Sequence, residues 1–170
     1  MTTFPELKTR ISTLGRAEYR YDRLVSDFAE HYLELARAGY EVLPDIMVFR
    51  CWLKHLHTEI RPSLLDAWRN MADLYGFKLG DRISVEGSDV YVVRVSCYPL
   101  EDIVRFTGYG SKKDGKPSQS SVTATVKERS VVQKHGQSLD EATLSSLYFE
   151  GSSRLPNVKQ FLQDEIAKLP

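Results

Sequence analysis

The sequence predicts an α+β protein. An N-terminal helical bundle is followed by a small antiparallel β-barrel or sheet of SH3-like or OB-like size, and then by short C-terminal helices. Apolar residues recur every three or four positions up to about residue 75, which is the period of an amphipathic helix. They then alternate with polar residues between about 82 and 132, the period of a half-buried strand. We therefore expect a helical region over residues 1–76, a β unit over 77–136 and a C-terminal helical segment over 137–170 that packs on the rest.

The longest predicted helix runs from about Pro5 to Arg37 and stops before Gly39. Its apolar stripe, interrupted at Glu18, repeats about every 3.5 residues and consists of Leu7, Ile11, Leu14, Tyr21, Val25, Phe28, Tyr32 and Leu35. At about 1.5 Å per residue, the helix is roughly 50 Å long, which exceeds the width of a compact domain of this size. It could wrap the rest of the chain, break near Gly15 or pack against a second copy. We predict a homodimer formed through this stripe.

Two shorter helices are expected before the β unit. The first starts near Pro44 and Asp45 and has one apolar face up to Ile60, and Pro62 is expected to end it. The second covers about 63–75 and is closed by Gly76.

The alternating region predicts about five short strands. The turn Glu86–Asp89 joins the first two strands as a hairpin, and a further strand covers about 103–109. A polar loop over 110–119 leads to a strand at 122–126, and Val131 and Val132 form the last one. Beyond them, Ser138 with Glu141 has the pattern of a capping box, and a final helix follows Pro156.

Composition places the chain among globular proteins. Apolar residues make up 42% of it, enough for a core, and the longest apolar runs are far shorter than the roughly 20 residues that span a bilayer. The N-terminus lacks the pattern of a signal peptide, and Cys51 and Cys97 cannot form a disulfide framework. We therefore expect a cytoplasmic protein with no membrane partner and with idle or buried thiols.

Positive charge is concentrated between residues 105 and 134, where seven Lys and Arg oppose only Asp114 and Glu128. The candidate nucleic-acid contacts are Arg105, Tyr109, Lys112, Lys113, Lys116, Lys127, Arg129 and Lys134. Cations neutralise phosphates, and tyrosines near them can stack on bases, although such rings can equally fill a core. We expect the 110–119 loop to be mobile, because it has almost no apolar residue to anchor it.

No catalytic motif is complete. The run Gly110–Pro117 resembles a phosphate-binding loop, but proline stands where a magnesium-binding hydroxyl is needed and a strand is expected where a helix should begin. Cys51, His55 and His57 lack the further ligands of a structural zinc site, and no nucleophile motif is present. The sequence therefore predicts no metal, no cofactor and no enzymatic activity.

The leading functional hypothesis is a non-enzymatic binding protein that contacts DNA or RNA backbone through the basic part of the β unit. The alternative is a protein–protein adaptor, an assembly subunit or an inhibitor of a larger nucleoprotein machine, self-associating through its long helix. A near-neutral pI of about 6.9 favours the alternative, whereas the clustering of positive charge favours nucleic acid.

Overall fold

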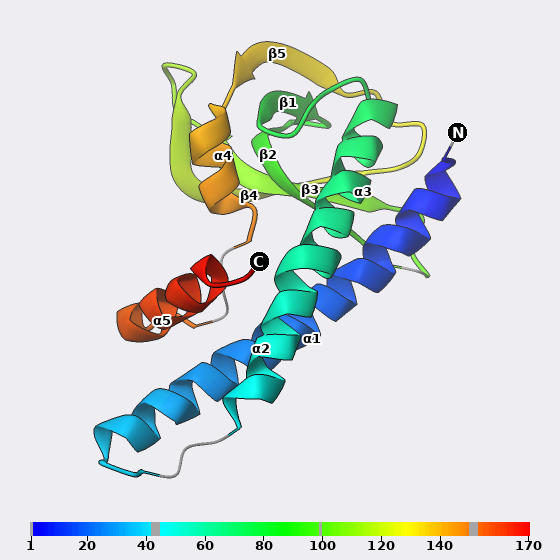
Figure 1. Ribbon diagram of the computed structural model, residues 1–170. Coiled ribbons are helices and arrows are strands. Elements are labelled where there is room, and N and C mark those ends of the chain that lie inside the picture. Colours follow the sequence, from blue (N-terminus) through cyan, green and yellow to red (C-terminus); the bar gives the residue numbers. More distant parts are fainter. Residues whose placement is uncertain (1, 42–44, 99, 150–152) are drawn as a thin grey trace. The chain divides into compact units, whose positions relative to one another are not determined.

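The α+β class is confirmed by the computed structural model, which describes residues 2–41, 45–98, 100–149 and 153–170 (Figure 1). Contacts divide the chain into two compact units. Unit 1 comprises Met1–Gly15 and Leu64–Phe149, and unit 2 comprises Arg16–Ser63 and Glu150–Pro170. Each unit therefore combines segments that are distant in the sequence, so its boundaries differ from those of the three consecutive segments expected above.

Helix α1, Phe4–Arg37, is continuous through Gly15 and contributes to the cores of both units. Phe4, Leu7 and Ile11 are buried in unit 1, whereas Val25 is buried in unit 2. Leu14 packs on the first core and Tyr21 and Phe28 on the second, while Tyr32 and Leu35 are half-buried. One chain thus accounts for most of the apolar stripe, and a homodimer through α1 stays a prediction.

Helix α2, Ile46–His55, continues through a π-helical turn, Leu56–Ile60, into helix α3, Arg61–Leu74. The expected break at Pro62 is therefore wrong. The π turn directly precedes this proline, whose missing N–H would interrupt regular α-helical hydrogen bonding. Asp45 caps α2 by accepting a hydrogen bond from the Met47 backbone N–H at 2.9 Å, and Pro44 lies outside the described residues.

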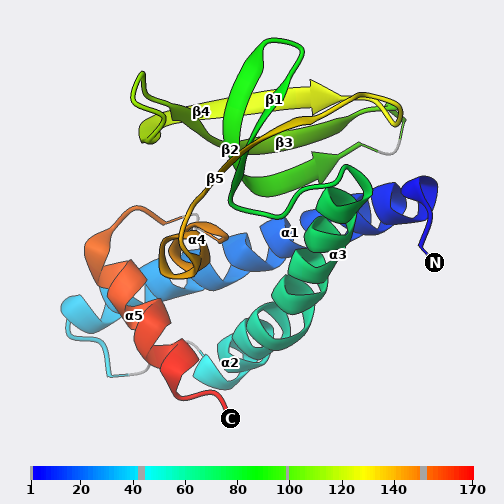
Figure 2. The same ribbon diagram turned by 90° about the horizontal axis from the view of Figure 1, so that it is seen from above.

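The β region is an open antiparallel sheet and not a closed barrel. Its strands are β1 (Asp81–Val85), β2 (Ser88–Cys97), β3 (Val104–Ser111), β4 (Pro117–Val126) and β5 (Gln133–Ser138). Their spatial order is β4-β3-β2-β1-β5, so β4 and β5 are the two edges (Figure 2). Closure would require these two strands to pair, and no such pairing occurs in the described part of the chain.

Local sequence explains where the strands begin and end. Glu86 and Gly87 both have positive φ, 46° and 83°, which is the geometry of a two-residue hairpin turn. The polar loop expected over 110–119 is shorter, because Ser111 and Pro117 already belong to strands. The last strand is β5 and not Val131–Val132, and the Val131 side chain is 87% exposed.

The core of unit 1 lies between one face of the sheet and helices α1, α3 and α4. Phe106 of β3 is fully buried and meets Phe77 edge-on, with ring centroids 5.0 Å apart. Leu144 and Tyr148 belong to the same cluster and come from α4 (Glu141–Leu147) and its C-cap. The expected cap at Ser138 is wrong. Asp140 accepts from the Thr143 backbone N–H at 2.7 Å, while the Ser138 hydroxyl donates to Asp81.

Unit 2 is held by a separate aromatic and aliphatic cluster. Phe49 stacks between Phe28 and Phe161, with centroid distances of 4.8 and 5.7 Å. Phe161 comes from helix α5, Pro156–Ala167. Arg61 makes ion pairs with Glu18 and Asp22 at 3.3 and 3.2 Å, so the half-buried cation is compensated.

Candidate nucleic-acid interface

The sheet of unit 1 has a polar face that alternates with its core face. We call this the outer face and use the name for eight of the side chains that alternate with core-facing positions, namely Arg94, Ser96, Arg105, Thr107, Tyr109, Ser121, Thr123 and Thr125. The same side of β2 continues to Tyr91 and Asp89, whose carboxylate is paired with Arg82. Register places Arg94 beside Thr107, which in turn pairs with Thr123. The hydroxyls of the two threonines lie 3.2 Å apart. The outer face thus carries two arginines and five hydroxyl residues, and none of its eight side chains is a carboxylate.

A tight lysine turn closes one end of the β3–β4 hairpin. We use this name for residues 112–116, which hold Lys112, Lys113 and Lys116, all exposed. The Lys112 N–H donates to the Lys116 carbonyl at 2.7 Å, and the Lys116 N–H donates to Asp114 Oδ1 at 3.0 Å. The turn therefore has a defined hydrogen-bonded geometry, in contrast to the loose loop expected from composition.

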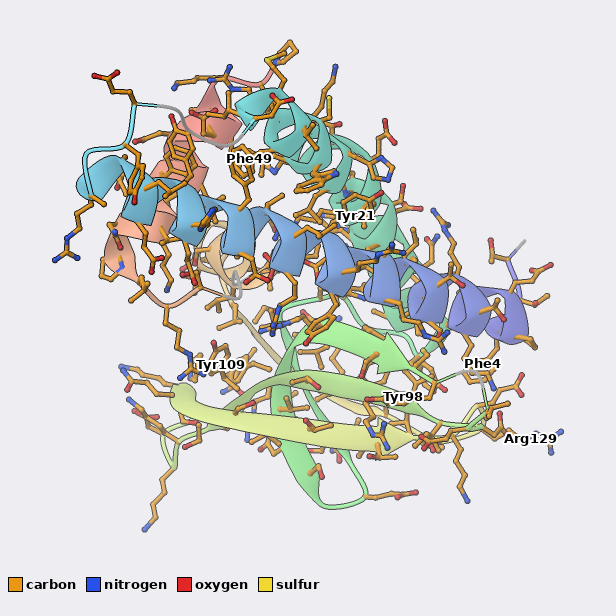
Figure 3. All side chains as sticks on the ribbon, turned by 90° about the horizontal axis from the view of Figure 1, so that it is seen from below. Phe4, Tyr21, Phe49, Tyr98, Tyr109 and Arg129 are labelled. Carbon is orange, nitrogen blue, oxygen red and sulfur yellow. The ribbon has the colours of Figure 1, made fainter. Side chains whose placement is uncertain are left out.

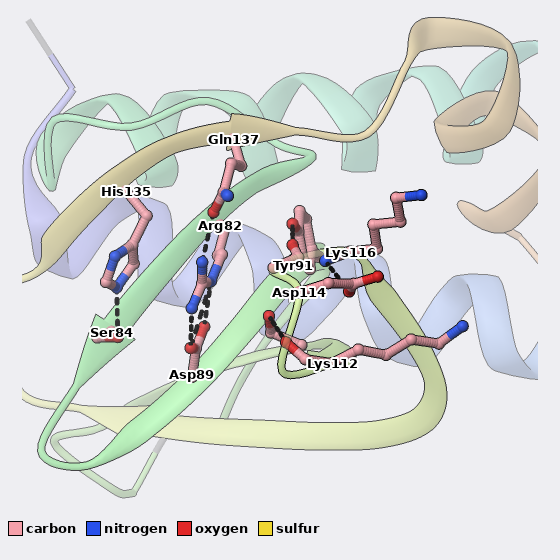
Figure 4. A network of polar contacts seen from close by, with 11 residues as sticks. Arg82, Ser84, Asp89, Tyr91, Lys112, Asp114, Lys116, His135 and Gln137 are labelled. Carbon is pink, nitrogen blue, oxygen red and sulfur yellow. Dashed lines mark hydrogen bonds and ion pairs between the residues drawn. The ribbon is translucent and has the colours of Figure 1, made fainter.

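A network of polar side chains holds the lysine turn against the sheet (Figure 4). The Tyr91 hydroxyl donates to the Gly115 carbonyl, and Gln137 Nε2 lies 2.6 Å from the position that a Cβ at Gly115 would take. Arg82 donates to Gln137 and forms an ion pair with Asp89 at 2.6 Å. The hydrogen bonds from Arg82 hold the pKa of Asp89 below its usual value, so this carboxylate stays ionised and paired at neutral pH.

The same network extends to β5. Ser84 Oγ and His135 Nε2 lie 2.6 Å apart, which ties β5 to β1 at the side-chain level. Burial raises the pKa of Tyr91, which keeps its phenol protonated and able to donate to the turn. Side chains from the neighbouring strands β1, β2 and β5 therefore hold the backbone of the lysine turn in place.

A second basic group lies at the opposite end of the hairpin. Lys127 and Arg129 are exposed just after β4, and the Tyr75 hydroxyl donates to the Lys127 carbonyl at 2.8 Å. Arg105 stacks over the Tyr98 ring at 4.6 Å and pairs with Glu101 at 3.3 Å. Figure 3 shows Tyr98 and Arg129 toward one end of the strands and Tyr109 toward the other.

The predicted contact residues are thus divided and do not form one patch. The three lysines of the turn lie together with Tyr109, which borders a groove of about 480 Å³ with Pro117 and Leu139. Strand β4 separates them from Lys127 and Arg129, and its ten residues span about 33 Å. Lys134 belongs to neither group, because it lies on β5 and pairs with Asp81 at 3.6 Å.

Sequence reasoning missed Arg94, which lies between the two basic groups. Its signal was present, since Arg94 is the charged residue between Val93 and Val95 in an alternating run. The sequence does not show that Arg94 lies next to the β3–β4 hairpin, because the pairing of β2 with β3 shifts between Val92 and Arg94.

Other site chemistries find little support in the described residues. They contain no group of three or more side chains that could hold a metal ion. His55 Nδ1 instead lies 2.6 Å from Glu59 Oε2, while Cys51 is exposed and Cys97 is buried. The run Gly110–Pro117, which resembles a phosphate-binding loop, leads into strand β4 and not into the helix N-terminus that would bind a phosphate. In the described ranges no helix has the length and apolar character needed to cross a membrane.

Comparisons with protein-family models, with curated proteins and with solved structures found no match for this chain. The outer face and the two basic groups are therefore the features that bear on function.

Proposed function

We propose that the protein is a non-enzymatic binding protein whose outer face contacts the sugar–phosphate backbone of nucleic acid. One observation carries the proposal. Arg94 and Arg105 lie on the outer face, with the lysine turn at one end and Lys127 and Arg129 at the other. The two carboxylates beside them are already paired, Asp89 with Arg82 and Glu101 with Arg105. Exposed sheet faces that combine cations with nearby aromatic rings are a recurrent platform for single strands.

The lysines and Arg129 of this surface are available to a ligand, whereas Arg105 already pairs with Glu101. None of Lys112, Lys113, Lys116, Lys127 and Arg129 forms an ion pair within the described part of the chain. Elsewhere, Arg50, Arg61 and Arg82 are each matched by carboxylates. Unmatched cations gain most from phosphate, since no internal pair has to be broken first.

Length and spacing fit an extended ligand. The two basic groups are about 33 Å apart along β4, and Arg94 and Arg105 provide charges between them. The threonine hydroxyls can donate to phosphate or sugar oxygens. The Tyr109 ring is half-buried against the core of unit 1 and borders the groove, where its accessible part can stack on a base. Because these contacts address mainly the backbone, binding should depend weakly on sequence.

The test is titration of a fluorescent single-stranded oligonucleotide at several salt concentrations. The variant Lys112→Gln/Lys113→Gln/Lys116→Gln should bind more weakly to all sequences, and the slope of log K against log salt should fall by about 0.7 per lost phosphate contact. The matched control is Lys54→Gln/Arg154→Gln/Lys159→Gln, which removes three exposed charges from unit 2. Equal binding by the two variants, or no binding by the natural chain at low salt, contradicts the proposal.

The alternative, an adaptor or assembly subunit, is favoured by exposed apolar side chains. Leu100 is 100% exposed, and Tyr98 and Val131 are 48% and 87% exposed. Self-association through α1 belongs to this alternative. Light scattering tests it directly, since a mass of 19.4 kDa at micromolar concentration contradicts a homodimer.

A further inference from the structure

The two edges of the sheet differ in how well they are protected. Strand β5 is a short edge of six residues that contains Lys134 and Gly136 and pairs with β1 through an irregular register. Its glycine has a φ of 78°, which is not extended geometry. Short length, a lysine and a bulge are features that prevent an edge from pairing with another chain.

Strand β4 has none of these features along most of its length. Its ten residues, Pro117–Val126, contain no charged side chain, and its proline is the first residue. Ser121–Val126 pair with β3 in unbroken register, and in the described part of the chain no strand pairs with the other side of β4. Near its start, the Ser120 N–H donates to Ser118 Oγ at 3.2 Å. The free side of β4 therefore offers a row of backbone donors and acceptors.

Both ends of this edge are positively charged. The lysine turn before β4 has three lysines and Asp114, a net charge of +2, and residues 127–129 after it have two cations and Glu128, a net charge of +1. Pairing of β4 with β4 of a second chain would bring like charges together. In an antiparallel pair, the lysine turn of one chain lies beside residues 127–129 of the other. In a parallel pair, each basic group lies beside its own counterpart. An extended segment with acidic residues at its two ends is complementary in both directions.

We propose that β4 is a docking edge for an extended peptide segment of a partner protein, one with an uncharged β-forming centre and acidic ends. The segment adds as a further strand to the sheet, so that its backbone bonds the free side of β4 and its acidic ends meet the two basic groups. The backbone pairing along β4 does not use the side chains of the outer face. The acidic ends, however, occupy the same two basic groups that are proposed to contact nucleic acid, so the peptide and an oligonucleotide should compete for them.

The experiment uses the full chain and the peptide Asp-Asp-Asp-Thr-Val-Thr-Val-Thr-Val-Asp-Asp-Asp. Fluorescence anisotropy measures its binding, and amide hydrogen exchange locates it. We expect saturable binding that weakens with salt, together with slower exchange of the β4 amides. A peptide with lysine in place of every aspartate should not bind. A peptide with two central prolines should bind much more weakly, because proline cannot donate to a ladder.

The variant Lys112→Gln/Lys113→Gln/Lys116→Gln should weaken binding roughly tenfold, while Lys54→Gln/Arg154→Gln/Lys159→Gln should not change it. All six side chains are exposed, so neither variant should unfold the protein. Three results would overturn the proposal. They are no binding of the acidic peptide, equal binding of the proline-containing peptide, or exchange protection that avoids β4.

Discussion

The two faces of the β2–β3–β4 sheet are made by the same strands and have opposite properties. On the core face, Val95, Phe106 and Ala124 are aligned across the strands and are nearly inaccessible to solvent. On the outer face, one residue away, Arg94, Thr107 and Thr123 are aligned in the same way, with Arg94 and Thr123 exposed and Thr107 half-buried. Because side chains alternate along a strand, one sheet can hold unit 1 together with one face and present a contact surface with the other. Substitutions on the core face should change stability, and those on the outer face should change binding.

The largest effect is expected at Gly108, which lies on the core-facing side of β3. A Cβ there would stand 1.7 Å from the Tyr91 carbonyl oxygen, a backbone atom that cannot move without shifting β2. Gly108→Ala should therefore cost more than about 4 kcal/mol of unfolding free energy, measured by urea denaturation.

Gly15→Ala is the matched control, since no atom lies within 4 Å of its added Cβ in helix α1. It should stabilise the chain by up to about 1 kcal/mol, because alanine favours a helix interior over glycine. Similar stability of the two variants would show that the close approach of β2 and β3 does not restrict Gly108.

A second test of the core face uses high pH. Burial raises the pKa of Tyr75 from 10.0 to about 12. Between these values the unfolded chain has lost the phenol proton that the folded chain keeps. The contribution of Tyr75 to stability should therefore be intact below pH 10 and should fall as pH rises toward 12. Thermal melts at pH 8 to 11 measure the slope, and Tyr75→Phe should make it shallower. An unchanged slope in Tyr75→Phe would contradict the assignment to this phenol.

The lysine turn should be less sensitive than the core face. Gly115 has a φ of 84°, and an alanine there would adopt a left-handed conformation that costs about 1–2 kcal/mol. Gly115→Ala should lower stability by about that amount and speed amide exchange over residues 112–116. Gly115→Asn should cost less, because asparagine tolerates this region better. A loss as large as that of Gly108→Ala would mean that the turn belongs to the folding core.

The smallest stability effect is expected at Arg94 on the outer face. Arg94→Gln should change unfolding free energy by less than about 0.5 kcal/mol, since the side chain is exposed. It should nevertheless lower the salt slope of oligonucleotide binding by about 0.7. A stable variant with an unchanged slope would exclude Arg94 from the interface while leaving the lysine turn to be tested separately.

Periodicity in the sequence was sufficient for local structure. The long first helix ends at Arg37 as predicted. A hairpin turn forms where it was expected, but it is shorter than Glu86–Asp89, because Ser88 and Asp89 already pair with β1 as part of β2. Two of the local predictions were wrong. Pro62 did not end a helix because a π turn precedes it, and Ser138 does not cap α4 because its hydroxyl bonds to Asp81.

The sequence was sufficient to predict most of the basic residues that form the candidate interface, but not how they are arranged in space. The basic residues between 105 and 134 were evident from the sequence, but the register of β3 with β4 separates Lys116 from Lys127 by the full length of a strand. The same register brings in Arg94 from β2, and pairing with β1 takes Lys134 to another edge. Charge counting along a chain cannot detect such divisions, because it ignores which strands are neighbours.

The amino-acid sequence by itself determined the α+β class, the first helix, the hairpin turn and the excess of positive charge, because each depends on residues within a few positions of one another. Only the tertiary structure decided that the sheet stays open, that α1 contributes to two cores and that β4 has a free edge between two cationic ends. These properties depend on contacts between residues far apart in the chain. Such contacts are fixed by packing and hydrogen bonding across the fold, and no local pattern specifies them.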